Sequence, residues 1–98
     1  MLQVKISSRF KTSFKRISKH KSFKQESFDY VLFMLSSQIE LPVKFKDHNL
    51  LGKHKDSREC HIAPDILLIY RVEDDKIFLE LLDIGTHASI FEIGRAHD

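Results

Sequence analysis

The feature that most constrains this chain is a set of three strand-like segments in its C-terminal half, separated by two short turns. The segments span residues 57–62, 66–73 and 76–84, with apolar side chains at alternate positions or in a continuous run. Ala63-Pro64-Asp65 forms the first turn and Asp74-Asp75 the second, and both are short enough for β-hairpins. We therefore expect an antiparallel meander of three strands.

The residues before this meander predict one strand and two helices. Residues 2–6 alternate apolar and polar side chains, as a short strand does. Two amphipathic stripes follow: Phe10, Phe14 and Ile17, then Phe28, Val31, Leu32 and Leu35. The second helix should begin near Gln25 and end at the Ser36-Ser37-Gln38 cluster. The order β-α-α-β-β-β predicts an α+β two-layer fold, with the N-terminal strand and a helical hairpin packed on a mainly antiparallel sheet.

The length of 98 residues suits a single domain. We assign it residues 1–93 and expect residues 94–98 to form a short polar tail. Pro42 excludes a third long helix, so residues 39–54 are predicted to form a long connection. Loops of that length are uncommon unless they carry function.

Composition indicates an ordinary globular protein, with 42% apolar and 31% charged residues. The single cysteine excludes an internal disulfide framework. The first residues lack the apolar run of a signal peptide, and the longest apolar run, residues 66–70, is far too short to span a bilayer. We expect a cytoplasmic protein with no membrane partner.

Positive charge is concentrated at the N-terminal end. Eight of the 16 lysines and arginines precede Glu26, the first acidic residue. Such a field attracts a polyanion or an acidic partner, because phosphate contacts release counterions. A solvated helix face, balanced by acids later in the chain, explains the same pattern, and charge alone leaves both open.

Strand alternation places two ionisable side chains on one open face of the first meander strand. Cys60 and Ile62 should point toward the helices, which sends Glu59 and His61 to the opposite face. Asp65, across the Pro64 turn, begins the next strand close to them. The fold itself does not require two carboxylates and an imidazole at these positions.

Three interpretations of this group remain open. Histidines can transfer protons near neutral pH while carboxylates orient them. His48, His61 and a carboxylate could instead bind a transition metal, although the spacing matches no tight zinc motif. The group could also be a polar surface without chemistry. A G-x-S-x-G elbow, a Gly-rich phosphate loop and a C-x-x-C pair are all absent from the sequence.

The ordered motifs of the C-terminal half resemble the YafQ-like branch of the RelE/ParE toxin superfamily. They are Lys46-Asp47-His48, Leu51-Gly52, Arg58-Glu59-Cys60-His61, Pro64-Asp65, Leu68-Ile69-Tyr70 and Gly85-Thr86-His87-Ala88 followed by Phe91. This resemblance implies a RelE-like fold and a ribosome-dependent mRNA endonuclease that works without a metal or organic cofactor. It also implies a cognate antitoxin, with operator DNA bound only through the antitoxin complex.

The resemblance carries site roles onto matching residues of this chain. The catalytic candidates are His48, Glu59, His61, Asp65 and His87. His87 is the first choice for general acid or base, His48 and His61 share the complementary role, and the two carboxylates orient the imidazoles. The RNA-binding candidates are Arg58, Phe91, Lys53, Lys55 and Lys46.

Two of these residues have a structural alternative. Arg58 could serve in an ion pair that positions its strand, and Phe91 could close the core instead of stacking on a base. At the level of the whole protein, the alternative is a non-catalytic toxin of the same fold, such as a ParE-like gyrase inhibitor. The histidine set favours the nuclease.

Two positions depart from the family pattern. Ser57 stands where relatives commonly have an aromatic residue, and Asp83 stands where an arginine is frequent. An acid near the scissile phosphate would oppose RNA binding, unless Lys53, Lys55 or Arg71 compensates.

Overall fold

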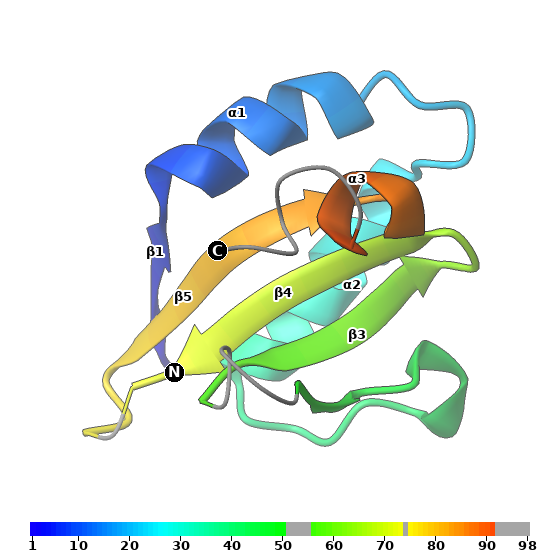
Figure 1. Cartoon of the computed structure of the whole chain (residues 1–98). Helices are drawn as coiled ribbons and strands as arrows, with labels where there is room; N and C mark the ends of the chain where they lie inside the picture. The colour runs from blue at the N-terminus through cyan, green and yellow to red at the C-terminus, as the bar shows by residue number, and fades with distance from the viewer. Residues whose placement is uncertain (51–55, 74, 92–98) are drawn as a thin grey trace.

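The computed structural model contains a five-stranded sheet with helices on both faces (Figure 1). It describes residues 1–50, 56–73 and 75–91, with residue 91 described by its backbone alone. The elements are β1 (Gln3–Ile6), α1 (Ser8–Ile17), α2 (Gln25–Ser36), the 3-10 helix η1 (Val43–Phe45), β2 (His48–Asn49), β3 (Arg58–Ala63), β4 (Ile66–Val72), β5 (Phe78–Gly85) and α3 (His87–Phe91).

The sheet has the strand order β1-β5-β4-β3-β2. The neighbours β5, β4, β3 and β2 pair antiparallel, whereas β1 pairs parallel to β5. The α+β fold, the meander and the inclusion of the first strand in the same sheet are therefore confirmed. The three meander strands end within two residues of their predicted bounds.

Helices α1 and α2 cover one face of the sheet and enclose the main core. The side chain of Ser7 caps α1 by accepting a hydrogen bond from the Phe10 backbone N–H at 2.9 Å. Phe10 and Phe14 both pack against Phe28, so the two helices meet through aromatic rings. This core also takes in Cys60 and Ile62 of β3, as alternation predicts (the core residues are Leu2, Phe10, Ile17, Phe28, Val31, Leu35, Leu41, Phe45, Cys60, Ile62, Ile66, Leu68, Tyr70, Leu79, Leu81 and Ile84).

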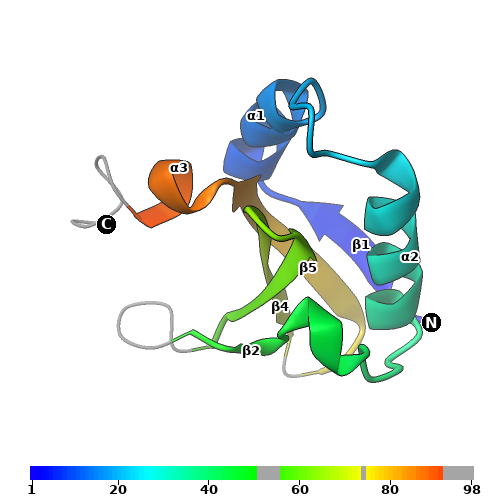
Figure 2. The same cartoon turned by 90° about the vertical axis from the view of Figure 1, so that its right-hand side faces the viewer.

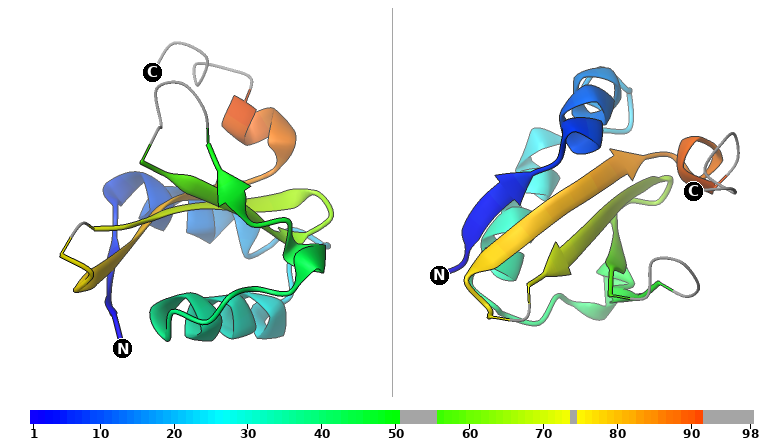
Figure 3. Two further views of the ribbon diagram at one scale, coloured as in Figure 1. Left: turned by 90° about the horizontal axis from the view of Figure 1, so that it is seen from below. Right: turned by 60° about the vertical axis from the view of Figure 1, so that its left-hand side comes forward.

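The short helix α3 lies on the opposite face of the sheet from α2 (Figures 2 and 3). Its Ile90 is buried and packs against Leu67 and Ile69 of β4. Sequence periodicity does not predict α3, because five residues are too few to show a stripe. This second small core lies on the same face of the sheet as Glu59 and His61 and borders them with apolar side chains.

The prediction of one long connection over residues 39–54 is wrong. The segment contains η1 and the two-residue strand β2, which extends the sheet beyond β3. Part of that stretch, residues 51–55, and the predicted tail, residues 94–98, lie outside the described residues. Within the described part of the chain, none of the helices has the length and apolar content needed to cross a lipid bilayer.

Candidate active site

His48 and Glu59 face each other across the short β2–β3 pair. Their Cα atoms are register partners, and His48 Nε2 lies 2.9 Å from Glu59 Oε1. The other ring nitrogen, Nδ1, lies 2.6 Å from the backbone carbonyl oxygen of Lys46. Because a carbonyl and a carboxylate both accept hydrogen bonds, every contact is satisfied when both ring nitrogens carry a proton. Neither nitrogen is then open to RNA.

Glu59 is almost completely buried, which is unusual for a carboxylate. Its exposed fraction is 5%, and its Oε2 makes no hydrogen bond within the described residues. Burial of a charge is costly unless a partner compensates for it. The contact with His48 supplies that partner from the solvent side, since 51% of the His48 side chain is exposed.

His61 and His87 form the second pair of the site. Their ring centroids are 5.8 Å apart and the ring planes are inclined by 63°. His61 stands on β3 and His87 is the first residue of α3, so elements distant in sequence bring them together. Two imidazoles at this separation can reach two oxygens of one phosphodiester group.

The turn before α3 determines where His87 stands. Thr86 Oγ1 accepts a hydrogen bond from the Ser89 backbone N–H at 3.2 Å, and the Thr86 carbonyl accepts one from Ile90 N–H at 3.0 Å. A Cβ on Gly85 would overlap Ser89 Oγ, so a side chain at this position would force that hydroxyl away from the Thr86 carbonyl to which it donates. This close approach explains the glycine before Thr86 and His87.

The surroundings of His61 lower its pKa below the usual histidine value. Burial is the main cause, and the charges of Lys46 and His87 act in the same direction. Glu59 and a hydrogen bond to the Pro64 backbone oppose the shift without cancelling it. His61 is therefore a neutral imidazole at pH 7, able to accept a proton.

The remaining catalytic candidate, Asp65, lies in the exposed β3–β4 turn. No hydrogen bond or ion pair joins it to the histidines within the described ranges. The charge of Lys46 acts on His61 and lowers the pKa of that imidazole. Lys53, Lys55 and the Phe91 side chain fall outside the described residues, so their RNA-binding roles stay predictions.

Arg58 lies on the face of β3 opposite to Glu59 and His61. Its Nη2 lies 3.2 Å from Asp47 Oδ2, and its Nε donates to Asp47 Oδ1 at 3.3 Å and to the Tyr70 hydroxyl at 3.2 Å. Its Nη1 also donates to Asn49 Oδ1 at 2.5 Å. The guanidinium thus binds Asp47 and Asn49, the two sequence neighbours of His48. It does not lie with the imidazoles on the other face of β3.

Asp47, Arg58 and Tyr70 form one hydrogen-bonded cluster, which we call the side-chain clasp. The sequence alone did not predict a role for Asp47 or Tyr70. The Tyr70 hydroxyl donates to Asp47 Oδ1 at 2.5 Å. Burial and, next, the hydrogen bond to Asp47 raise the pKa of Tyr70 far above the usual value. Their place in the Lys46-Asp47-His48 and Leu68-Ile69-Tyr70 motifs was the available signal.

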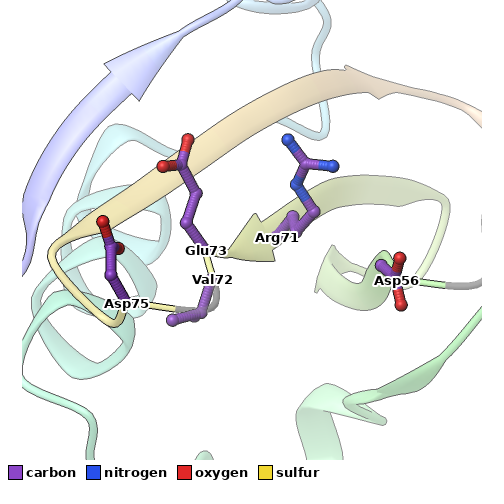
Figure 4. A pocket seen from close by; sticks show the side chains of 5 residues that line it. All are labelled: Asp56, Arg71, Val72, Glu73 and Asp75. Atoms are coloured by element: carbon purple, nitrogen blue, oxygen red, sulfur yellow. The ribbon is translucent and has the colours of Figure 1, made fainter.

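The two departures from the family pattern are Ser57, directly before β3, and Asp83 of β5, which pairs with Ile69, the β4 partner of Glu59. Ser57 is buried, and Asp83 is buried with its Oδ1 accepting a hydrogen bond from the Ile84 N–H at 2.8 Å. Arg71 forms an ion pair with Glu80 and does not reach the histidines. Figure 4 shows Arg71 beside a cavity of about 410 Å³ with an acidic rim, lined by Asp56, Arg71, Val72, Glu73 and Asp75.

The donor set of the site suits proton transfer. Across the described ranges, no three His, Cys, Asp or Glu side chains are grouped closely enough to hold a metal ion together. Cys60 is buried and its pKa is raised, first by burial, which makes its thiol a core group. The residues that converge are one neutral imidazole, a second imidazole beside it, and a His48–Glu59 pair with Lys46 nearby.

Comparison with known proteins identifies the family of this chain. Residues 2–92 match the family described as "Bacterial toxin of type II toxin-antitoxin system, YafQ". The mRNA interferase toxin YafQ of Escherichia coli is 38% identical over 58 residues, which cover 59% of this chain and 61% of that protein. The matched stretch thus spans less than two thirds of this curated relative.

Solved structures resemble the whole described fold. The metal-bound toxin from Helicobacter pylori has a TM-score of 0.84 at 35% identity, covering 93% of this chain and 100% of that one. The Escherichia coli DinJ-YafQ complex gives a TM-score of 0.80 at 29% identity, covering 93% and 99%. The chain therefore belongs to the YafQ family of bacterial toxins from type II toxin–antitoxin systems.

Proposed function

We propose that this protein is an mRNA interferase, an endoribonuclease that cleaves mRNA on the ribosome. The observation that carries the proposal is the His61–His87 pair, 5.8 Å between ring centroids, with His61 neutral at pH 7. RNA brings its own nucleophile, the 2′-hydroxyl, so the enzyme must supply a base, an acid and charge stabilisation. The activity of the Escherichia coli relative supports the same reaction class.

In this mechanism His61 is the general base and His87 the general acid. His61 takes the proton of the 2′-hydroxyl as the 2′-oxygen attacks phosphorus. The bond from phosphorus to the 5′-oxygen breaks, and protonated His87 gives its proton to that oxygen. The products are a 2′,3′-cyclic phosphate and a 5′-hydroxyl end, and a proton must return from His61 to His87 through solvent.

The other site residues are proposed to stabilise charge at the phosphate and to orient the imidazoles. The charge of Lys46, which acts on His61, supplies positive charge near the phosphate oxygens, while Glu59 is paired with His48. Asp65, in the next turn, is proposed to orient an imidazole once RNA is bound. Neither step calls on a metal ion, and activity after exhaustive chelation tests that point directly.

We further propose that a cognate antitoxin restrains the toxin in the cytoplasm. The complex solved for the Escherichia coli relative supports a partner of this kind. The first helix carries basic residues in its last turn and no acid in its first turn, which suits acidic protein segments or ribosomal RNA. Operator DNA would be contacted through the antitoxin.

Induction of the chain in bacteria tests the proposal. Wild type should arrest growth and produce new mRNA ends within translated codons, and His87→Gln should abolish both. Purified ribosomes added to a purified transcript should be required for cleavage. Growth arrest with intact mRNA and inhibited gyrase would instead establish the ParE-like alternative.

A further inference from the structure

A groove separates the C-terminal end of α1 from the junction of β5 and α3. Figures 1 and 2 show these segments side by side at one end of the sheet. The groove has a volume of about 200 Å³ and lies outside the group formed by His48, Glu59 and His61. Two of its lining residues, Thr86 and Ser89, flank His87 in sequence, so the groove borders the turn that carries His87.

The floor of the groove is apolar. Ile17 and Ile84 are 6% and 2% exposed and line it together with Gly85, which adds no side chain. Such a surface accommodates the carbon face of a ribose or the flat face of a base, and it gives neither a polar partner. The hydroxyl groups of Ser13, Thr86 and Ser89 occur along the same lining.

The rim of the groove is cationic. Arg16 and Lys19 are exposed, His20 is half-buried beside them, and no acidic side chain occurs among the described residues that line the groove. His20 Nδ1 accepts a hydrogen bond from the Ser22 backbone N–H at 3.0 Å, so the neutral ring carries its proton on Nε2. The rim therefore presents hydrogen-bond donors, which phosphate oxygens accept.

We propose that this groove binds the nucleotide next to the scissile phosphate, with its ribose over Ile17 and Ile84 and its phosphate at Arg16 and Lys19. The inference rests on the proposed ribonuclease function and identifies where the mRNA strand continues beyond His87. An RNA strand suits the groove better than an acidic peptide, because the groove borders the turn that carries His87 and combines phosphate donors and hydroxyls with an apolar floor.

Binding of an uncleavable RNA tests the groove. A short oligonucleotide with every 2′-hydroxyl methylated is titrated into the full chain, and backbone amide shifts are followed by NMR. Amides of Ser13, Ile84 and Thr86 should shift together with those of His61 and His87. The double variant Arg16→Ala/Lys19→Ala should bind about tenfold more weakly, with a salt slope lower by about 0.7 for each phosphate that the variant no longer neutralises.

The matched control removes two charges from α1 outside the groove. Lys11→Ala/Lys15→Ala takes two exposed cations from α1 without changing the lining. Equal weakening in both double variants would mean a diffuse positive field and would overturn the proposal. Groove amides that shift with an acidic peptide but not with RNA would overturn it as well.

The outcomes also separate this inference from the proposed function. If RNA shifts the His61 and His87 amides but not those of the groove, the groove proposal is refuted and the proposed function is not. If the wild-type chain neither binds the oligonucleotide nor cleaves mRNA in cells, both the groove proposal and the proposed function are refuted. Folding of every variant is checked by the dispersion of its amide spectrum.

Discussion

Asp47 and Arg58 are joined across β2 and β3 by two contacts, 3.2 Å between Nη2 and Oδ2 and 3.3 Å between Nε and Oδ1. Strand β2 has only two residues, too few to hold its place by backbone pairing alone. The side-chain clasp beneath it therefore determines where His48 stands on the other face. Arg58 acts in this arrangement as a positioning residue.

A double-mutant cycle on Asp47→Asn and Arg58→Lys should give a coupling free energy of roughly 1–3 kcal/mol in urea unfolding. The physical reason is a partly buried, two-point contact that also accepts the Tyr70 hydroxyl. The exposed pair Lys5–Glu73 serves as the control, and its coupling should stay below about 1 kcal/mol. Arg58→Lys that alters only the salt dependence of RNA binding, with unchanged stability, would restore Arg58 as an RNA contact.

Glu59→Gln should lower the pKa of His61 further. The Glu59 charge raises the pKa of His61, so its removal leaves burial and the charge of Lys46 less opposed. NMR titration of the His61 ring measures the change directly. Cleavage should fall by at least about tenfold, since the His48 contact is also weakened. An unchanged His61 titration would contradict the electrostatic account.

The free energy of unfolding should decrease as the pH falls below about 6.5 through the His61 contribution. His61 has a lowered pKa in the folded chain, so the unfolded chain binds more protons between the two pKa values. The His61 contribution is complete above the unfolded pKa and is lost as the pH falls to the folded one. Urea unfolding from pH 5 to 8 should show a shallower pH dependence for His61→Gln than for wild type. Parallel curves would exclude this contribution.

Gly85→Ala should destabilise the chain by about 1–3 kcal/mol and reduce cleavage, because the new methyl group would overlap Ser89 Oγ. Adding Ser89→Ala should recover part of the stability, since it removes the overlapping atom. Ser89→Ala alone keeps its backbone N–H bond to Thr86 and is the control. If the second substitution rescues nothing, the close approach at Gly85 is not the cause.

Sequence patterns predicted the long elements and the short first strand, but they missed β2 and α3. The stripe of Phe28, Val31 and Leu35 located α2, and alternation correctly placed Cys60 and Ile62 in the core. Strand β2 and helix α3 carry His48 and His87, yet two and five residues show no period. Tertiary contacts position β2, whereas α3 combines the Thr86 cap with packing of Ile90 on β4.

Strand alternation was sufficient to predict the face of β3 on which Arg58 lies. It shares the strand parity of Cys60 and Ile62, so its place on the face opposite to His61 followed from the same rule. The near-complete burial of Glu59 could not be predicted, because it depends on His48 arriving from β2. Composition also gave no sign of Asp47, whose role depends on Arg58 and Tyr70 meeting it.

The parallel contact between β1 and β5 has a consequence for synthesis of the chain. Gln3 is paired with Phe78, so β1 cannot complete its pairing until β5, the last strand of the sheet, has been synthesised. Pairings of such long range are slow to nucleate, since the loop entropy must be overcome first. The groove beside α1 and the turn that carries His87 both depend on the end of β5. Under the proposed function, a nascent chain therefore has no complete site until β5 and His87 have been synthesised.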